Sequence, residues 1–505
     1  MSTGPQPRAQ WAALPQPSPH VIAPTEHLLN QGGDLRIAVD PTSGRTRYLC
    51  ASRPQAQLGF GSSTASVVSP RGFAAADRLR SRLAAAASQE APEIAYGREL
   101  QRMRGELAAL CGLDDLAGLE ILFAASGTDI HLVLGQLLCA GRERPTFAIG
   151  IEPGETGSGV PQALRGAHFS SRTALGREVC EGAAAGAAGV TQLIAVTARE
   201  ADGTPRSAGL IASELEAAVT HLAASGHLLL TVTDLSKTGL LSFDLAQVLD
   251  LRRRFPGRVD VLVDACQFRL SSASLRAYLD QDCLVAVTGS KFLGGPTFSG
   301  ALLIPPAFAA RLSSQTAPPG LDAYVAGADL PTGWRSAQDL APAANLGLLL
   351  RWEAALAELR AFQAVPDWQI ARTLQAFERA TLAGLAADPM FERLPTPRPD
   401  RRVLGDAGWD AVPTIFPFLL RRPGGRYFTV AETTAVYRSL GAEGLLIGQP
   451  VACGARDGAA ISALRFCASA RLVTDALCED GAGEAAMLGA AAKALARVAE
   501  TARRL

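Results

Sequence analysis

Residues 285–305 read VAVTGSKFLGGPTFSGALLIP and place one lysine, Lys291, between two apolar runs. Both runs, at 283–288 and 299–305, are continuously hydrophobic, which is typical of strands buried on both faces of a sheet. A lysine among apolar walls loses its proton more easily, and its neutral amine is the nucleophile that forms a Schiff base. Taken alone, Lys291 could also be an ordinary solvated lysine after a strand.

Five more apolar runs of the same kind alternate with helical patterns earlier in the chain. They lie at 119–125, 146–151, 191–198, 227–234 and 259–265. This alternation predicts an α/β fold, with a mostly parallel sheet wrapped by helices.

The pattern changes at both ends of this region and suggests three parts. Residues 1–70 are rich in Pro, Gln, Ser and Gly and show little periodicity, which predicts an N-terminal arm. Residues 71–335 form the predicted large domain. Residues 336–505 begin with long helical stretches and continue with strand-like runs at 411–420 and 461–470, which predicts a smaller α+β domain.

Composition narrows the class of protein. The 505 residues carry 48 basic and 48 acidic side chains, so the formal net charge of zero gives no electrostatic case for nucleic-acid or membrane partners. We find no apolar stretch of membrane-spanning length and no signal-peptide core at the N-terminus, and therefore expect a cytoplasmic protein. The nine cysteines occur singly and the six histidines show no metal-ligand spacing, so no metal site is expected.

The run at 119–125 is followed by Ser126, Gly127 and Thr128 and then by a helical pattern. The free N–H groups and the dipole of such a helix N-terminus attract an anion, and the hydroxyls add donors. The alternative is that Thr128 or Asp129 only caps the helix.

Two further motifs carry polar side chains that suit a ligand. Asp264 ends the strongly apolar run VDVLVDA, where an unpaired carboxylate is unfavourable, and Gln267 follows one turn later. Arg465 lies in a β-like run near the C-terminus, and a guanidinium can hold a carboxylate through two parallel hydrogen bonds. Asp264 could instead be a capping residue, and Arg471 competes with Arg465 for the carboxylate.

In this order, the motifs resemble those of the fold-type-I enzymes that depend on pyridoxal 5′-phosphate (PLP), most closely the class V aminotransferase and cysteine desulfurase branch. The resemblance spans residues 70 to 480 and implies a large domain with a seven-stranded-type, mostly parallel sheet and a smaller C-terminal α+β domain. It also implies a homodimer with active sites at the subunit interface.

The resemblance assigns a role to each motif. Lys291 would bind PLP as a Schiff base and move the substrate Cα proton, and Asp264 would keep the pyridine nitrogen protonated. Gln267 would contact the ring hydroxyl, and Arg465 the substrate carboxylate. The phosphate would be held by Ser126, Gly127, Thr128, Thr288 and Ser290.

Two assignments concern less regular segments. His168 is expected to stack on the cofactor ring, whereas His131 is expected to be a packed helical residue. Ser236 falls where the family has an Asn-Glu-x-Gly loop near the ring hydroxyl, which is a departure from the family pattern.

The predicted function is that of a PLP-dependent enzyme acting on an amino acid, with aminotransferase as the first choice. A lyase, or an enzyme that forms carbon–carbon bonds, in specialised metabolism is the alternative, and a non-catalytic regulatory relative is a remote one. Desulfuration is disfavoured because no cysteine lies between Cys283 and Cys453.

Overall fold

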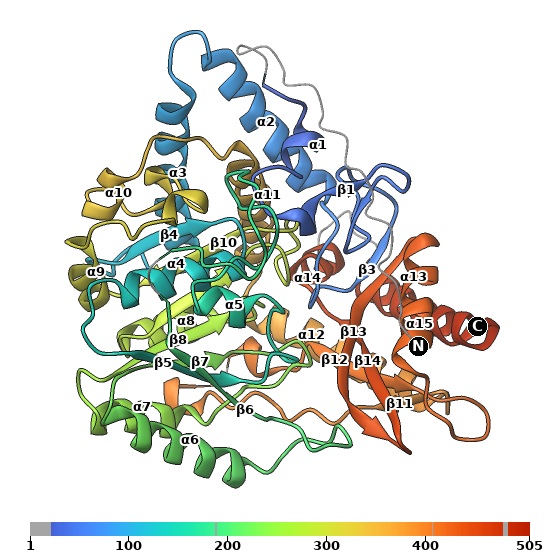
Figure 1. The fold of residues 1–505 in the computed structure, drawn as a ribbon. Helices are drawn as coiled ribbons and strands as arrows, with labels where there is room; N and C mark the ends of the chain where they lie inside the picture. Colours follow the sequence, from blue (N-terminus) through green and yellow to red (C-terminus); the bar gives the residue numbers. More distant parts are fainter. Residues whose placement is uncertain (1–21, 187–188, 407, 478–482) are drawn as a thin grey trace.

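The structure is a computed structural model that describes residues 22–186, 189–406, 408–477 and 483–505. Residues 1–21 of the predicted arm lie outside the described residues. Two sheets and the helices around them form a large and a small domain (Figure 1). None of the helices in the described ranges combines the length and hydrophobicity that a membrane span requires.

The large domain contains a seven-stranded sheet in the order β4-β10-β9-β8-β7-β5-β6. Strands β5 to β9 pair in parallel, and β10 pairs antiparallel with both β9 and β4, so the predicted mostly parallel sheet is confirmed. Nearly all residues of β4, β5 and β7 to β10 are buried, because helices cover both faces of the sheet. The strands are Glu120–Ala124 (β4), Thr146–Ile151 (β5), Gln192–Val196 (β6), His227–Thr233 (β7), Val259–Ala265 (β8), Leu284–Thr288 (β9) and Gly300–Ile304 (β10).

Helices connect and cover these strands, as βαβ units require. Those between Pro70 and Asp339 are Pro70–Ala86 (α2), Pro92–Leu110 (α3), Gly127–Cys139 (α4), Val160–Leu164 (α5), Ala208–Ala223 (α6), Leu245–Arg254 (α7), Ser272–Asp280 (α8), Pro306–Ser313 (α9) and Arg335–Asp339 (α10). The helix Leu346–Gln363 (α11) is buried over most of its surface and packs on α2 and α3. The indole nitrogen of Trp352 on α11 donates to the carbonyl of Gly300 at 3.0 Å, which ties α11 to β10.

The small domain has a five-stranded sheet in the order β11-β12-β14-β13-β3. Its strands are Phe391–Arg393 (β11), Ile415–Leu420 (β12), Leu445–Arg456 (β13), Ala459–Cys467 (β14) and, from the N-terminal segment, Leu58–Phe60 (β3). The flanking helices are Asp367–Ala386 (α12), Val430–Ala442 (α13), Ala470–Leu477 (α14) and Gly483–Arg504 (α15).

The described part of the N-terminal segment, from residue 22, packs on both domains. The helix Thr25–Leu28 (α1) contacts α2 and α11, and the short strands Val39–Asp40 (β1) and Arg45–Thr46 (β2) pair with each other. Farther on, β3 pairs in parallel with β13. In Figure 1 this blue segment lies between the helices of the large domain and the small sheet. The segment therefore contributes an edge strand to the small domain.

Candidate active site

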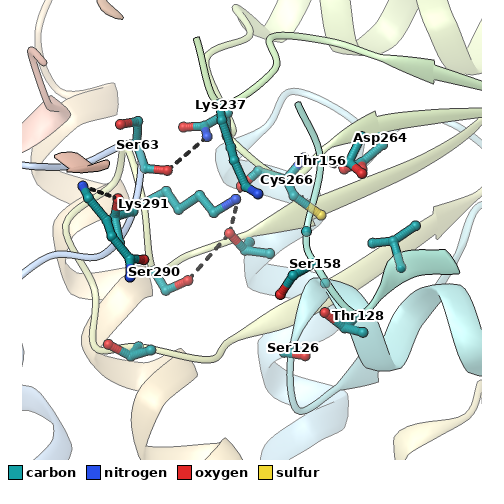
Figure 2. A pocket seen from close by; sticks show the side chains of 18 of the residues that line it. Ser63, Ser126, Thr128, Thr156, Ser158, Lys237, Asp264, Cys266, Ser290 and Lys291 are labelled. Atoms are coloured by element: carbon teal, nitrogen blue, oxygen red, sulfur yellow. Dashed lines mark hydrogen bonds between the residues drawn. The ribbon is translucent and has the colours of Figure 1, made fainter. Parts of the chain in front are cut away.

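A cavity of about 1060 Å³, its open mouth included, lies at the carboxyl ends of β4, β7, β8 and β9. Ligands bind at this edge in open α/β sheets because the loops that follow the strands diverge there. Nine of the residues predicted from the sequence line the cavity: Ser126, Gly127, Thr128, Asp264, Gln267, Thr288, Ser290, Lys291 and Arg465. Figure 2 shows several of them pointing into one space.

Lys291 follows β9 and reaches into the cavity with its amine. Burial lowers the pKa of Lys291, and the positive charges of Arg465 and Arg269 lower it further. Within the described residues, its Nζ atom has no hydrogen-bond partner. The turn before it needs a glycine, because a Cβ atom at Gly289 would lie 2.4 Å from the Cβ of Ala355 on α11. The site thus holds an amine that deprotonates easily and is not engaged by the protein.

The N-terminus of α4 faces this amine across the cavity. Ser126 caps the helix by accepting a hydrogen bond from the Asp129 N–H group at 3.3 Å. A Cβ atom at Gly127 would lie 2.6 Å from the Sγ atom of Cys266, so only glycine fits between α4 and β8. The result is an open helix N-terminus with a hydroxyl on either side, an arrangement that binds phosphate.

Asp264 lies at the end of β8, and its Oδ1 atom accepts a hydrogen bond from the Cys266 N–H group at 3.2 Å. The imidazole of His131 lies beside it, with Nε2 3.5 Å from Oδ2 of Asp264. His131 contacts the Gly127 carbonyl through Nδ1 at 2.7 Å, and because a carbonyl only accepts, the ring proton lies on Nδ1. The buried Nε2 atom is left without a hydrogen-bond partner.

Three other predicted residues, Thr288, Ser290 and Gln267, also make hydrogen bonds at the cavity. Thr288 donates to the Cys266 carbonyl at 2.6 Å, and Ser290 donates to Thr288 at 3.4 Å. Gln267 donates to the carbonyl of Ser63 at 3.1 Å, so the N-terminal segment closes this side of the cavity.

Arg465 on β14 reaches the cavity from the small domain. Its Nε and Nη2 atoms donate to the Gln449 carbonyl, Nη2 also donates to the Thr64 hydroxyl at 2.7 Å, and Nη1 donates to the Lys237 carbonyl at 3.2 Å. Within the described residues, four of its five N–H groups are therefore engaged, and one on Nη1 has no partner. Arg471 does not line the cavity, because it donates to the Val67 carbonyl and pairs with Asp475.

Two predicted residues lie outside the cavity lining, which corrects their predicted positions. His168 bonds through Nδ1 to the Tyr324 hydroxyl at 2.7 Å and packs against that ring, so it is held away from the cavity. Ser236 donates to the Glu155 carboxylate at 2.7 Å within a buried network that includes Thr238 and Arg199. His131 is the histidine that lines the cavity, although its place within a helical pattern predicts a packed helical residue.

Three further cations that no sequence motif predicts line the cavity: Arg36, Arg47 and Lys237. Arg36 pairs with Asp34, lies over the ring of Phe298 and donates to the Thr128 hydroxyl at 3.2 Å. No pattern in the N-terminal segment marks Arg36. Lys237 could have been noticed, because the chain has only three lysines. His131 could have been found from its spacing, since it lies four residues after Gly127 and so faces the same side of α4.

No family model matches the sequence, and no curated protein matches it either. Solved structures do match. A cystine C–S lyase in complex with cysteine persulfide aligns over 88% of this chain and 98% of its own, at 15% identity and a TM-score of 0.54. A serine palmitoyltransferase from S. paucimobilis with a bound PLP–myriocin aldimine aligns over 94% and 96%, at 13% identity and a TM-score of 0.52.

A NifS-like protein from Rickettsia africae aligns over 88% of this chain and 99% of its own, at 11% identity and a TM-score of 0.52. The chain therefore has the fold of the fold-type-I PLP-dependent enzymes, as the sequence predicted. At these identities the comparisons establish the fold alone.

Proposed function

We propose that the protein is a PLP-dependent enzyme that acts on the α-carbon of an amino acid. The observation that carries this proposal is the convergence of Lys291, Asp264 and the N-terminus of α4 on one cavity. An amine, a carboxylate and an anion site match the carbonyl, the ring nitrogen and the phosphate of PLP. Further support comes from the close packing of Gly127 against Cys266, which leaves no room for a side chain at the helix N-terminus, and from the Nε2 atom of His131, which has no hydrogen-bond partner among the described residues.

When bound, PLP supplies an electron-withdrawing ring that stabilises the negative charge left on Cα after a bond to it breaks. Lys291 would hold the cofactor through Nζ, and its amine, when free, would take the Cα proton of the substrate. Its lowered pKa favours the neutral form that both steps need. Asp264 would hold a proton on the ring nitrogen, and His131 lies beside Asp264, with Nε2 3.5 Å from Oδ2.

The phosphate is assigned to the N–H groups and hydroxyls around Gly127 and Thr128, with Ser126, Thr288 and Ser290 alongside. Arg36 adds a positive charge next to Thr128. Gln267 is assigned to the ring hydroxyl. Arg465 is assigned to the substrate carboxylate, which it would bind through its one free N–H group unless the small domain shifts on binding.

Transamination is the reaction that we propose first. Elimination or carbon–carbon bond formation is the second candidate, and the cystine lyase and the serine palmitoyltransferase among the similar structures favour it. A non-catalytic relative is disfavoured because both Lys291 and Asp264 are present. We also propose a homodimer, which light scattering of the purified protein would detect.

Spectroscopy of the purified protein tests the proposal. With PLP, the protein should become yellow, and borohydride should fix the cofactor covalently on Lys291, as peptide mass analysis would show. Lys291→Ala should lose the covalent attachment. A protein that takes up no PLP, or carries it on another residue, would refute the proposed function. If an amino acid converts the cofactor to its amine form, the reaction is transamination. If the cofactor is not converted and an elimination or condensation product is released, the second candidate is correct.

A further inference from the structure

The use of lysine in this chain is unusual. Only Lys237, Lys291 and Lys493 are lysines, and the other 45 of the 48 basic residues are arginines. Lys237 and Lys291 both line the cavity, whereas Lys493 is exposed on α15. An arginine keeps its proton at any physiological pH, but a desolvated lysine can release and take one. The cavity therefore holds two of the three lysines of the chain.

Lys237 lies in the loop after β7, and its backbone is fixed while its amine is not. Its N–H group donates to the carbonyl of Glu155 at 2.9 Å. Among the residues that the structure describes, its Nζ atom makes one long hydrogen bond, to the Gly154 carbonyl at 3.4 Å. Figure 2 shows the side chains of Lys237 and Lys291 entering the cavity and pointing toward one another. The amine of Lys237 is thus directed at the reaction space and weakly held by the protein.

The charged groups around Lys237 come from three elements. Arg465 on β14 and Lys291 after β9 are cations, and Glu155 in the loop after β5 is a carboxylate. Glu155 is already bonded to Arg199 and to two hydroxyls, so it compensates Lys237 only partly. Burial, followed by the charges of Arg465 and Lys291, lowers the pKa of Lys237 to about 8. Both the protonated and the neutral forms of Lys237 are therefore present near neutral pH.

We propose that Lys237 accepts the proton that an incoming amino acid must lose from its ammonium group before its nitrogen can react. This inference rests on the proposed function. In the step, one N–H bond of the substrate ammonium breaks and one N–H bond forms on Lys237, which leaves a neutral substrate amine and a Lys237 ammonium. The nitrogen of Lys291 holds the cofactor at this moment, so Lys237 is the free lysine amine in the cavity.

The position of Arg465 supports a role for Lys237 next to the substrate. Its Nη1 atom, which carries the free N–H group, contacts the Lys237 carbonyl. A substrate carboxylate bound at this N–H group would therefore lie next to the backbone of Lys237, in the cavity that both lysine side chains line.

Stopped-flow absorbance with the PLP-loaded protein tests the inference. Glycine, L-alanine and L-serine are mixed with the protein between pH 6 and 10, and the rate constant of the cofactor absorbance change is measured for the fastest of the three. The wild type should react faster as the pH rises and level off once Lys237 is largely neutral, because only neutral Lys237 accepts a proton. Lys237→Met should be about 100-fold slower and lose this rise, as expected for loss of a general base. Added imidazole, which accepts protons but forms no Schiff base, should restore part of the rate.

Two further variants separate proton transfer from other roles. Lys237→Arg keeps the positive charge but cannot accept a proton, so it should be as slow as Lys237→Met. Lys493→Met removes the third lysine and should behave as the wild type. A fast Lys237→Arg protein beside a slow Lys237→Met protein would overturn the inference in favour of simple charge binding. The inference would also be overturned if Lys237→Met binds PLP, as its yellow colour would show, and keeps the wild-type rates and pH profile. By contrast, wild-type protein that carries no PLP on Lys291 would refute the proposed function itself.

Discussion

Gly127→Ala is the substitution whose effect the structure defines most closely. The added Cβ atom would lie 2.6 Å from Sγ of Cys266 and 3.5 Å from Cγ2 of Thr288. Ordinary contacts between such atoms begin near 3.5 Å, so helix α4 or Cys266 would have to move by about 1 Å. Cys266 is buried. Overpacking of this kind destabilises by about 1–3 kcal/mol.

The movement would be felt at the phosphate site because Gly127 is the first residue of α4. If the strain is relieved by displacing the helix N-terminus, PLP affinity should fall by about tenfold or more, since 1.4 kcal/mol corresponds to a factor of ten. Equilibrium titration of the apoprotein with PLP, followed by absorbance, measures this change. Gly105→Ala on the exposed side of α3 is the matched control, because a Cβ atom there meets nothing within 4 Å.

A second substitution identifies the cause of the loss. Cys266→Ala removes the Sγ atom that the new Cβ would meet and leaves its own Cβ atom at an acceptable 3.5 Å from it. The double variant Gly127→Ala/Cys266→Ala should therefore recover most of the lost affinity, and the coupling between the two changes should exceed about 1 kcal/mol. Unchanged PLP affinity in Gly127→Ala, or additive effects in the double variant, would refute the argument that close packing against β8 shapes the phosphate site.

Three further predictions address other parts of the site. Asp264→Asn should still bind PLP but lose at least 100-fold in the exchange of the substrate Cα proton with deuterated water, measured by NMR, because the ring nitrogen loses its charged partner. Arg465→Met should raise the dissociation constant of amino acids by about 10- to 100-fold without changing that of PLP, while Arg471→Met, outside the cavity, should change neither. Burial, with a smaller contribution from the nearby charge of Asp34, raises the pKa of Asp129 to about 7, so the folded apoprotein binds this proton more tightly than the unfolded chain does. Its free energy of unfolding should therefore fall as pH rises from about 4 to 7, and denaturant titrations should show a flatter pH dependence for Asp129→Asn.

The elements that the sequence predicts well are those whose pattern is local. All seven strands of the large sheet appear near their predicted places, because strands buried on both faces must be continuously apolar. Strand β13 was missed, since Gly448 and Pro450 interrupt its apolar run. The structure explains the glycine: a Cβ atom at Gly448 would lie 2.6 Å from the Cβ of Arg465, its partner on β14. A residue that breaks the strand pattern is therefore what lets Arg465 enter the sheet beside the cavity.

The site residues that could be predicted also have a local sequence signal, whereas those that were missed do not. Lys291, Asp264 and Gly127 each stand directly after or before an apolar strand, so their meeting at one sheet edge follows from the order of elements. Arg36 reaches the cavity only because the N-terminal segment folds back on both domains, and no local pattern records that path. Lys237 has no recognisable motif, but the chain has only three lysines, and two of them, Lys237 and Lys291, line the cavity. In this chain, the rarity of lysine therefore pointed to a site residue that the spacing of motifs did not reveal.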